Sequence, residues 1–181
     1  AHVLLGDYPT SEPQLQRRLP TERYYEEEGR AELTPRDFGI LMHRVFENAA
    51  TTDEIYMAIE AMTQDGVLDE KEAPRLRELV EKALADPVTA EWFGGRWQVV
   101  RNENEIILPG SGTTRRPDRV MTDGERAVVV DYKFGDRETA RHRKQIREYL
   151  RLLRQMGYTR TEGYLWYVRL GRTERVEEKE D

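Results

Sequence analysis

The sequence predicts an α+β domain in which helices flank a central mixed sheet in an α/β/α arrangement, and three observations carry this prediction. Before residue 95, apolar residues recur three or four positions apart, which is the spacing of amphipathic helices. After residue 96, they gather in short runs that are typical of strands. A long amphipathic segment then separates two such runs, as a crossover helix separates two parallel strands.

The N-terminal part of the domain is predicted to be helical. The stretch LTPRDFGILMHRVFENAA indicates a first helix capped by Thr34 or Asp37. TTDEIYMAIEAMTQDG indicates a second helix, capped by Thr52 or Asp53 and ending at Gly66. LDEKEAPRLRELVEKALADP predicts a third helix with a proline in its first turns, and PVTAEWFG predicts a short fourth helix.

Strands are expected next. RWQVVRNENEIILPG predicts a strand or a hairpin, with a turn at Pro109-Gly110. RRPDRVMTDGERAVVVDYKFG predicts a hairpin of its own, in which Asp118 to Thr122 pairs with Ala127 to Tyr132 across a tight turn at Asp123-Gly124.

The C-terminal part is expected to hold a long helix and a closing strand. The helix, in DRETARHRKQIREYLRLLRQMGY, carries an apolar stripe of Ile146, Tyr149, Leu150, Leu153 and Met156. The closing strand, in TEGYLWYVRLG, is expected to add beside the strand that ends at Tyr132. Residues 172–181 are expected to form an acidic, solvated tail.

Composition excludes several classes of protein. The 181 residues are 38% hydrophobic and 35% charged, which is polar but within the globular range. There is no cysteine, so disulfides, cysteine-ligated iron–sulfur clusters and thiolate zinc sites are excluded, and a reducing, cytoplasmic location is expected. No apolar run approaches the 18 or so residues of a membrane span. Because the opening is not methionine and lacks an evident core, we expect residues 1–33 to be an extension that links the domain to a longer polypeptide.

Charge is segregated along the chain, although the formal net charge of −6 argues as a whole against nucleic-acid binding. Residues 53–91 hold eleven acidic and four basic residues. Residues 137–160 hold eight basic and two acidic residues, so the predicted long helix presents a local positive field.

Three charged residues on the predicted hairpin need a partner. Side chains alternate along a strand, so Asp131 and Lys133 share one face, and the hairpin brings Asp118 towards them. Clustered carboxylates repel each other, and a divalent cation is the usual remedy. The alternative is a surface ion pair on an edge hairpin, but the apolar run before Asp131 favours a buried, central strand.

These residues resemble the PD-(D/E)xK nuclease superfamily, in its RecB-type branch. The stretch RPDRV…VVVDYKFG matches the family's hairpin, whose second strand typically reads DYKTG. Two further motifs lie at the expected distances: Gly39 to His43 with Glu47 one turn later, and Gln145 with Tyr149. The resemblance spans about residues 34 to 170, which indicates a nuclease domain over 34–171 with a restriction-endonuclease-like core.

The resemblance implies a role for each site residue. Asp118 and Asp131 would be carboxylate ligands of Mg²⁺ or Mn²⁺, His43 would add a ring nitrogen, and the backbone carbonyl of Tyr132 would complete the set. Lys133 would position or activate the attacking water. For His43 the alternative is a histidine packed in the core.

Further residues are implied to support the site. Many relatives carry a glutamate before the hairpin, and Glu103 fits that pattern better than Glu105, although either could be a solvated acid. Glu47 is a second auxiliary acid. The resemblance places Gln145 and Tyr149 on one helix face towards DNA, with ordinary helix packing as the alternative. Basic residues of the same helix are expected to contact phosphates: Lys144, Arg147 and Arg151.

The resemblance also implies a cellular context. RecB-type domains often end AddA- or RecB-like helicase-nucleases of the exonuclease V beta-subunit kind, within the UvrD superfamily. We therefore expect upstream helicase domains, a partner subunit of the AddB or RecC kind, and a part in DNA double-strand-break repair and recombination. No Walker-type phosphate loop lies in these residues, so a motor would lie outside them. The alternatives are an inactive, nuclease-like DNA-binding or scaffold module, and a non-nuclease protein whose basic helix binds a protein partner.

Overall fold

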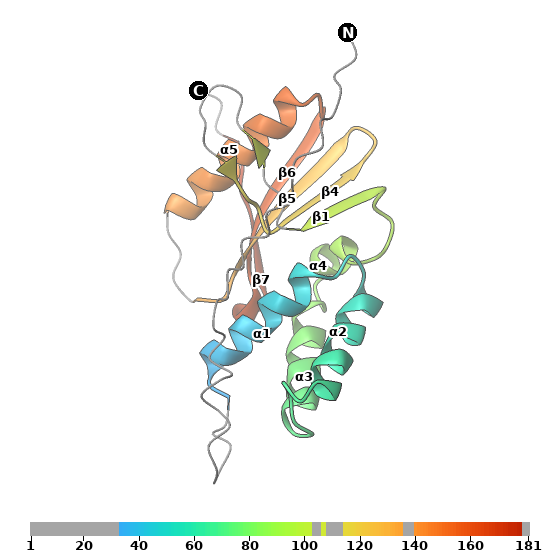
Figure 1. Ribbon diagram of the computed structural model, residues 1–181. Coiled ribbons are helices and arrows are strands. Elements are labelled where there is room, and N and C mark those ends of the chain that lie inside the picture. Colours follow the sequence, from blue (N-terminus) through green and yellow to red (C-terminus); the bar gives the residue numbers. More distant parts are fainter. Residues whose placement is uncertain (1–32, 103–105, 108–113, 136–139, 179–181) are drawn as a thin grey trace, which may run out of the picture. The chain divides into compact units, whose positions relative to one another are not determined.

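Helices flank both faces of a mixed five-stranded sheet in the computed structural model of this chain (Figure 1). The structure describes residues 33–102, 106–107, 114–135 and 140–178. The helices are α1 (Pro35–Glu47), α2 (Thr52–Gln64), α3 (Glu72–Ala83), α4 (Pro87–Trp92), α5 (Ala140–Gln155) and the short 3₁₀ helix η2 (Val168–Leu170). The strands are β1 (Val99–Asn102), β2 (Ile106–Ile107), β3 (Thr114–Arg115), β4 (Arg119–Asp123), β5 (Arg126–Lys133), β6 (Arg160–Tyr167) and β7 (Arg172–Arg175).

The main sheet has the strand order β1-β4-β5-β6-β7. β5 and β6 are parallel, and the other neighbours are antiparallel. Because parallel neighbours need a crossover, α5 connects β5 to β6 over one face of the sheet. The predicted α+β class, the hairpin and the crossover helix are confirmed.

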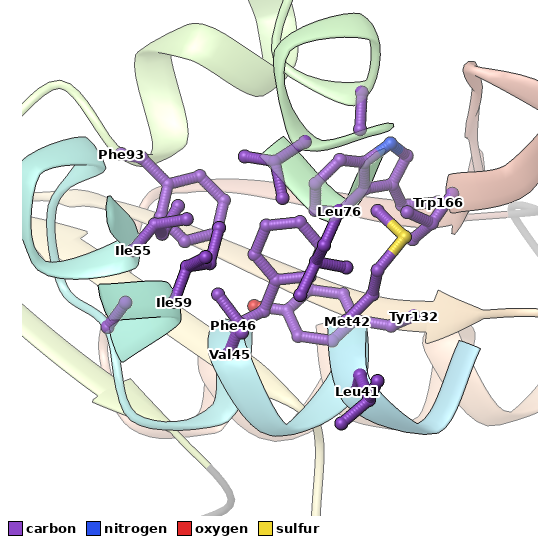
Figure 2. Close-up of a cluster of buried hydrophobic side chains, with 14 of the residues drawn as sticks. Leu41, Met42, Val45, Phe46, Ile55, Ile59, Leu76, Phe93, Tyr132 and Trp166 are labelled. Carbon is purple, nitrogen blue, oxygen red and sulfur yellow. The ribbon is translucent and has the colours of Figure 1, made fainter. Parts of the chain in front are cut away.

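The two faces of the sheet carry separate hydrophobic cores. On one face, Val128, Val130 and Tyr132 of β5 pack with α1–α4. On the other face, Ala127 and Val129 of the same strand pack with α5. Side chains alternate along β5, so a single buried strand supplies both cores. Figure 2 shows the first core, in which Tyr132 lies among side chains of the N-terminal helices.

The N-terminal helices begin with side-chain caps. Thr34 and Asp37, the two predicted candidates, form a reciprocal capping box at the start of α1. In α2 the same arrangement is made by Thr51 and Glu54, so the predicted caps Thr52 and Asp53 are wrong by one or two residues. Among the described residues no helix has both the length and the apolar character that crossing a membrane requires.

Helix α5 lies close against β6 because a glycine faces it. A Cβ atom on Gly163 would lie 2.4 Å from Cγ2 of Ile146, so no larger residue fits at that position without a shift. The predicted apolar stripe is buried except for Met156, which follows the end of the helix and is 65% exposed. Met156 is therefore not part of the core.

Two boundaries differ from the prediction. Asp123 pairs with Arg126, so the hairpin turn consists of Gly124 and Glu125 and lies one residue later than expected. Gly124 has a φ of 57°, which explains why a glycine is needed there. The segment expected to be a solvated tail instead begins with β7, and Val176 just after it is buried.

The strand or hairpin predicted before residue 110 is divided between two sheets. β1 joins the main sheet beside β4, whereas β2 pairs with β3 in a separate two-stranded sheet. The predicted Pro109-Gly110 turn and residues 1–32 of the expected extension 1–33 lie outside the described residues, whereas Leu33 packs against the core.

Arg119 is a buried cation that joins the helices to the sheet. Its guanidinium donates hydrogen bonds to backbone carbonyls just after α1 and at the end of α4. The guanidinium carbon Cζ lies 4.0 Å from the centroid of the Phe93 ring. The three acceptors are the carbonyls of Ala49 at 2.6 Å, Ala50 at 2.7 Å and Trp92 at 2.7 Å. Helix C-terminal ends carry partial negative charge, so they can hold a cation without a carboxylate.

Replacing this guanidinium should destabilise the domain strongly. We expect Arg119→Leu to lower the free energy of unfolding by about 3–5 kcal/mol, because it leaves several buried carbonyls without donors. Arg101→Leu on β1 is the matched control, because Arg101 is exposed and should change stability little. Urea unfolding of both variants checks this, and equal stability of Arg119→Leu and the parent protein would contradict the assigned role.

Candidate active site

Gly39 brings α1 against the end of β5. A Cβ atom at this position would lie 3.2 Å from Cβ of Phe134, which is tighter than an ordinary contact. The absence of a side chain therefore lets the helix approach the strand. His43 lies one turn further along the same helix face, so the glycine sets the distance between His43 and the sheet.

His43 lies between two carboxylates and two aromatic rings. Its Nε2 is 3.4 Å from Oδ1 of Asp118, and its Nδ1 is 3.7 Å from Oε2 of Glu47. The ring centroids of Tyr132 and Phe134 lie 6.1 Å and 5.6 Å from that of His43, both in edge orientation. With 32% of its side chain exposed, His43 is at the border of the core, not inside it.

Asp118 is held where the β4–β5 ladder ends. The last paired residues are Arg119 and Val130, so Asp118 lies just beyond them. Its Oδ2 accepts a hydrogen bond of 2.5 Å from the backbone N–H of Tyr132. One carboxylate oxygen thus extends the ladder while the other faces His43.

Asp131 and Lys133 form an ion pair on the α5 side of β5. Lys133 Nζ lies 2.9 Å from Oδ2 of Asp131, whose side chain is almost fully buried. Burial raises the pKa of the Asp131 carboxyl and the nearby Asp118 carboxylate raises it further, while the Lys133 charge acts in the opposite direction. Since β5 lies in the interior of the sheet, the alternative of an edge hairpin is wrong.

These four side chains form what we call the charged cluster: His43, Asp118, Asp131 and Lys133. Its donors are an imidazole and two carboxylates, a mixed nitrogen and oxygen set that suits Mn²⁺ or Mg²⁺. Burial, and then the nearby Asp118 carboxylate, raise the pKa of the Asp131 carboxyl, so a divalent cation would be a favourable neighbour for this pair of acids. Among the described residues, however, no three His, Asp or Glu side chains are already arranged to hold a metal ion.

Of the predicted auxiliary acids, the structure describes the position of Glu47 only. Glu47 faces the Nδ1 side of His43, which places it next to the charged cluster. Glu103 and Glu105 lie outside the described residues, so the choice between them stays a prediction.

His142 is a neighbour of the charged cluster that the sequence interpretation missed. It lies in the first turn of α5, and its Nδ1 is buried with no hydrogen-bond partner in the part of the chain that the structure describes. Burial and the Lys133 charge lower the pKa of His142, which favours the neutral form of the imidazole. The sequence feature that could have indicated His142 is its spacing, because it precedes Gln145 and Tyr149 by three and seven residues on the same helix.

Gln145 and Tyr149 interact with each other. Gln145 Nε2 donates a hydrogen bond of 2.9 Å to the Tyr149 hydroxyl. Tyr149 is fully buried in the core beneath α5, so a direct contact with DNA is not open to it in this structure. Of the two predicted DNA contacts, only Gln145 is partly exposed. The buried Tyr149 hydroxyl accepts the hydrogen bond that holds the Gln145 amide.

The basic helix is partly neutralised by the C-terminal segment. Acidic residues at and after β7 form ion pairs with two of its arginines, Arg143 with Glu174 and Arg154 with Glu178. Arg147 donates a hydrogen bond to the backbone carbonyl of Glu177. Lys144 and Arg151 are exposed, so two of the three predicted phosphate contacts keep accessible side chains. The positive field of α5 is therefore narrower than its sequence indicated.

Comparison with known proteins agrees with this geometry. A search of curated proteins found no match. The family model of the PD-(D/E)XK nuclease superfamily matches residues 14–181, which include the charged cluster and the elements that position it. Since the match covers most of the sequence, the chain belongs to the PD-(D/E)XK nuclease superfamily.

Proposed function

We propose that the chain is a metal-dependent deoxyribonuclease that hydrolyses phosphodiester bonds at the charged cluster. The observation that carries this proposal is the approach of His43 to Asp118 from a different element, at 3.4 Å, beside the Asp131–Lys133 pair. Members of this superfamily are nucleases and generally use divalent ions, typically Mg²⁺. DNA is the expected polymer.

Four groups would hold the cation, namely the side chains of His43, Asp118 and Asp131 and the backbone carbonyl of Tyr132. When bound, a divalent ion supplies Lewis-acid polarisation of the phosphate and lowers the pKa of a bound water. Because the donors are not yet gathered around one point, we expect binding to draw Asp131 from its pair with Lys133.

The side chains of the protein have separate tasks in this proposal. Lys133 carries a positive charge next to the reacting phosphate, where it stabilises negative charge in the transition state and orients the attacking water. Asp118 is preorganised, because the N–H of Tyr132 fixes one of its oxygens. His43 presents Nε2 to the same place from α1.

The surface of α5 is proposed to guide the DNA backbone. Lys144 and Arg151 are exposed and seven residues apart, so they lie on one side of the helix. Arg147 lies between them and donates to the Glu177 carbonyl at 3.3 Å, which holds its guanidinium on the same surface. Gln145, whose amide donates to the Tyr149 hydroxyl, is proposed as a further polar contact to the DNA.

The wider context is proposed from the sequence resemblance alone. The RecB-type motifs support a nuclease module of a helicase-exonuclease of the exonuclease V kind, with a partner subunit and a part in double-strand-break repair. The competing proposal, an inactive DNA-binding module, retains the same fold. Metal-dependent cleavage separates the two.

Substitutions in the charged cluster should abolish cleavage without unfolding the domain. We expect Asp131→Asn, Asp118→Asn and Lys133→Ala each to slow DNA hydrolysis by about 100-fold or more, because each removes a group that stabilises the transition state or binds the cation. Hydrolysis should also stop in chelator and return with Mg²⁺ or Mn²⁺. Lys82→Ala, which removes the lysine of an exposed ion pair on α3, is the matched control. Cleavage by Asp131→Asn at the parental rate would refute the proposed site.

Charge reversal on α5 should reduce the salt dependence of DNA binding. For single-stranded DNA, the slope of log affinity against log salt should fall by about 0.7 for each phosphate that Lys144→Glu/Arg151→Glu no longer neutralises. The titration is made in Ca²⁺, which we expect to permit binding without turnover. Lys71→Glu/Lys82→Glu on the acidic helices has the same charge change and should leave the slope unaltered. If the α5 double variant kept the same salt slope as the control double variant, Lys144 and Arg151 would be ordinary solvated side chains that do not contact DNA.

A further inference from the structure

Phe134 contacts α1 at two positions that are one helical turn apart. Its Cβ lies close to Gly39, where a Cβ atom would approach to 3.2 Å. Its ring centroid lies 5.6 Å from that of His43, with 64° between the ring planes. The residue directly after Lys133 therefore touches the helix that carries His43, although Phe134 itself has no polar group to offer the site.

The His43 ring needs such support. It is one-third exposed, and an imidazole on a helix surface can rotate about its side-chain bonds among several rotamers. In the structure its two nitrogens face different carboxylates, Nε2 towards Asp118 and Nδ1 towards Glu47. Rotation of the ring would remove Nε2 from Asp118, so side chains packed against the ring can help to hold it in this orientation.

Two aromatic rings lie beside the imidazole. Tyr132, in the buried core, meets His43 at a centroid distance of 6.1 Å and an angle of 76°. Phe134 lies closer and is only partly buried, packed against the margin of the same core. Aromatic edge contacts of this kind contribute about 0.5–1.5 kcal/mol beyond the area that they bury.

We propose that Phe134 is a positioning residue that holds the His43 imidazole with Nε2 towards Asp118, and that Gly39 provides the room for it. This inference rests on the proposed function, in which His43 binds the catalytic cation. Phe134 acts through His43 and touches neither the substrate nor the cation in this proposal.

The test compares Phe134→Ala with two milder variants. Phe134→Tyr keeps a ring at the same place, and Phe134→Leu keeps much of the volume without a ring. Gly39→Ala disturbs the same contact from the helix side. Tyr56→Ala is the matched control, because Tyr56 is also a partly buried aromatic at the margin of this core but belongs to α2, whereas His43 belongs to α1.

The first measurement uses metal-free protein and does not depend on activity. The chain has three histidines, so the ring signals of His43 can be assigned in a long-range ¹H–¹⁵N spectrum by means of His43→Gln. We expect Phe134→Ala and Gly39→Ala to shift the His43 ring signals towards those of a free, averaging imidazole. Phe134→Tyr should retain the parental signals, and Tyr56→Ala should not move them.

The second measurement is the affinity for Mn²⁺ by calorimetry. We expect the dissociation constant to rise about tenfold in Phe134→Ala, the lower end of what removal of a supporting group around a metal site costs. Cleavage should then be recovered largely at saturating Mn²⁺, since the catalytic groups are intact. Phe134→Leu should lie between the parent protein and Phe134→Ala.

The outcomes separate this inference from the proposed function. If Phe134→Ala and Phe134→Leu lower the melting temperature as Tyr56→Ala does but leave the His43 signals unchanged, Phe134 is only a packing residue and the inference is overturned. If the His43 signals shift but His43→Gln binds Mn²⁺ and cleaves DNA normally, Phe134 positions His43 while the ligand role of His43 fails. Should Phe134→Ala not fold, Phe134→Leu and Gly39→Ala decide the question by the same spectrum.

Discussion

The buried guanidinium of Arg119 is the interaction on which the arrangement of the domain depends. A cation of this size is removed from water without any carboxylate partner within hydrogen-bond distance among the described residues. Carbonyls at the ends of α1 and α4 replace the missing hydration, and Asn102 of β1 adds its side-chain oxygen at 3.2 Å. Since these acceptors come from separate elements, a rearrangement of the helices on the sheet would remove hydrogen bonds from a buried charge, which is costly.

This anchor also determines where the charged cluster forms. Arg119 is the first residue of β4 and points into the core of the N-terminal helices, so the preceding Asp118 is held at the end of the ladder. The same guanidinium fixes the C-terminal end of α1, the helix that carries His43. Asp118 and His43 are thus positioned by one common contact, which explains how a residue on a helix meets a carboxylate 75 positions later in the chain.

The sequence was sufficient for elements that have a strong local pattern. The apolar run of β5, the amphipathic face of α5 and the threonine and aspartate at the start of α1 each specify a structure without distant contacts. β7 was missed because RTER has no apolar alternation, and this edge strand forms through backbone pairing with β6. Tyr149 shows the limit for the site, because a motif position cannot tell a buried tyrosine from one that faces a ligand. Phe134 could be found only once its tertiary contact with His43 was known.

The position of the charged cluster at a strand end has a chemical consequence. Within the ladder, Asp131 and Lys133 face α5 while Tyr132 faces α1, so side chains from the two faces are kept apart by the sheet. The pairing of β4 with β5 ends at Arg119 and Val130, so this separation ends just beyond that pair. There Asp118 faces His43 with one oxygen, while its other oxygen accepts a hydrogen bond from the Tyr132 backbone. Groups from both layers then meet at one place that is buried enough to perturb the pKa of a carboxyl and open enough to leave a third of His43 exposed. A site in the middle of one face of the sheet would contain side chains from that face alone, either those that face α5 or those that face α1.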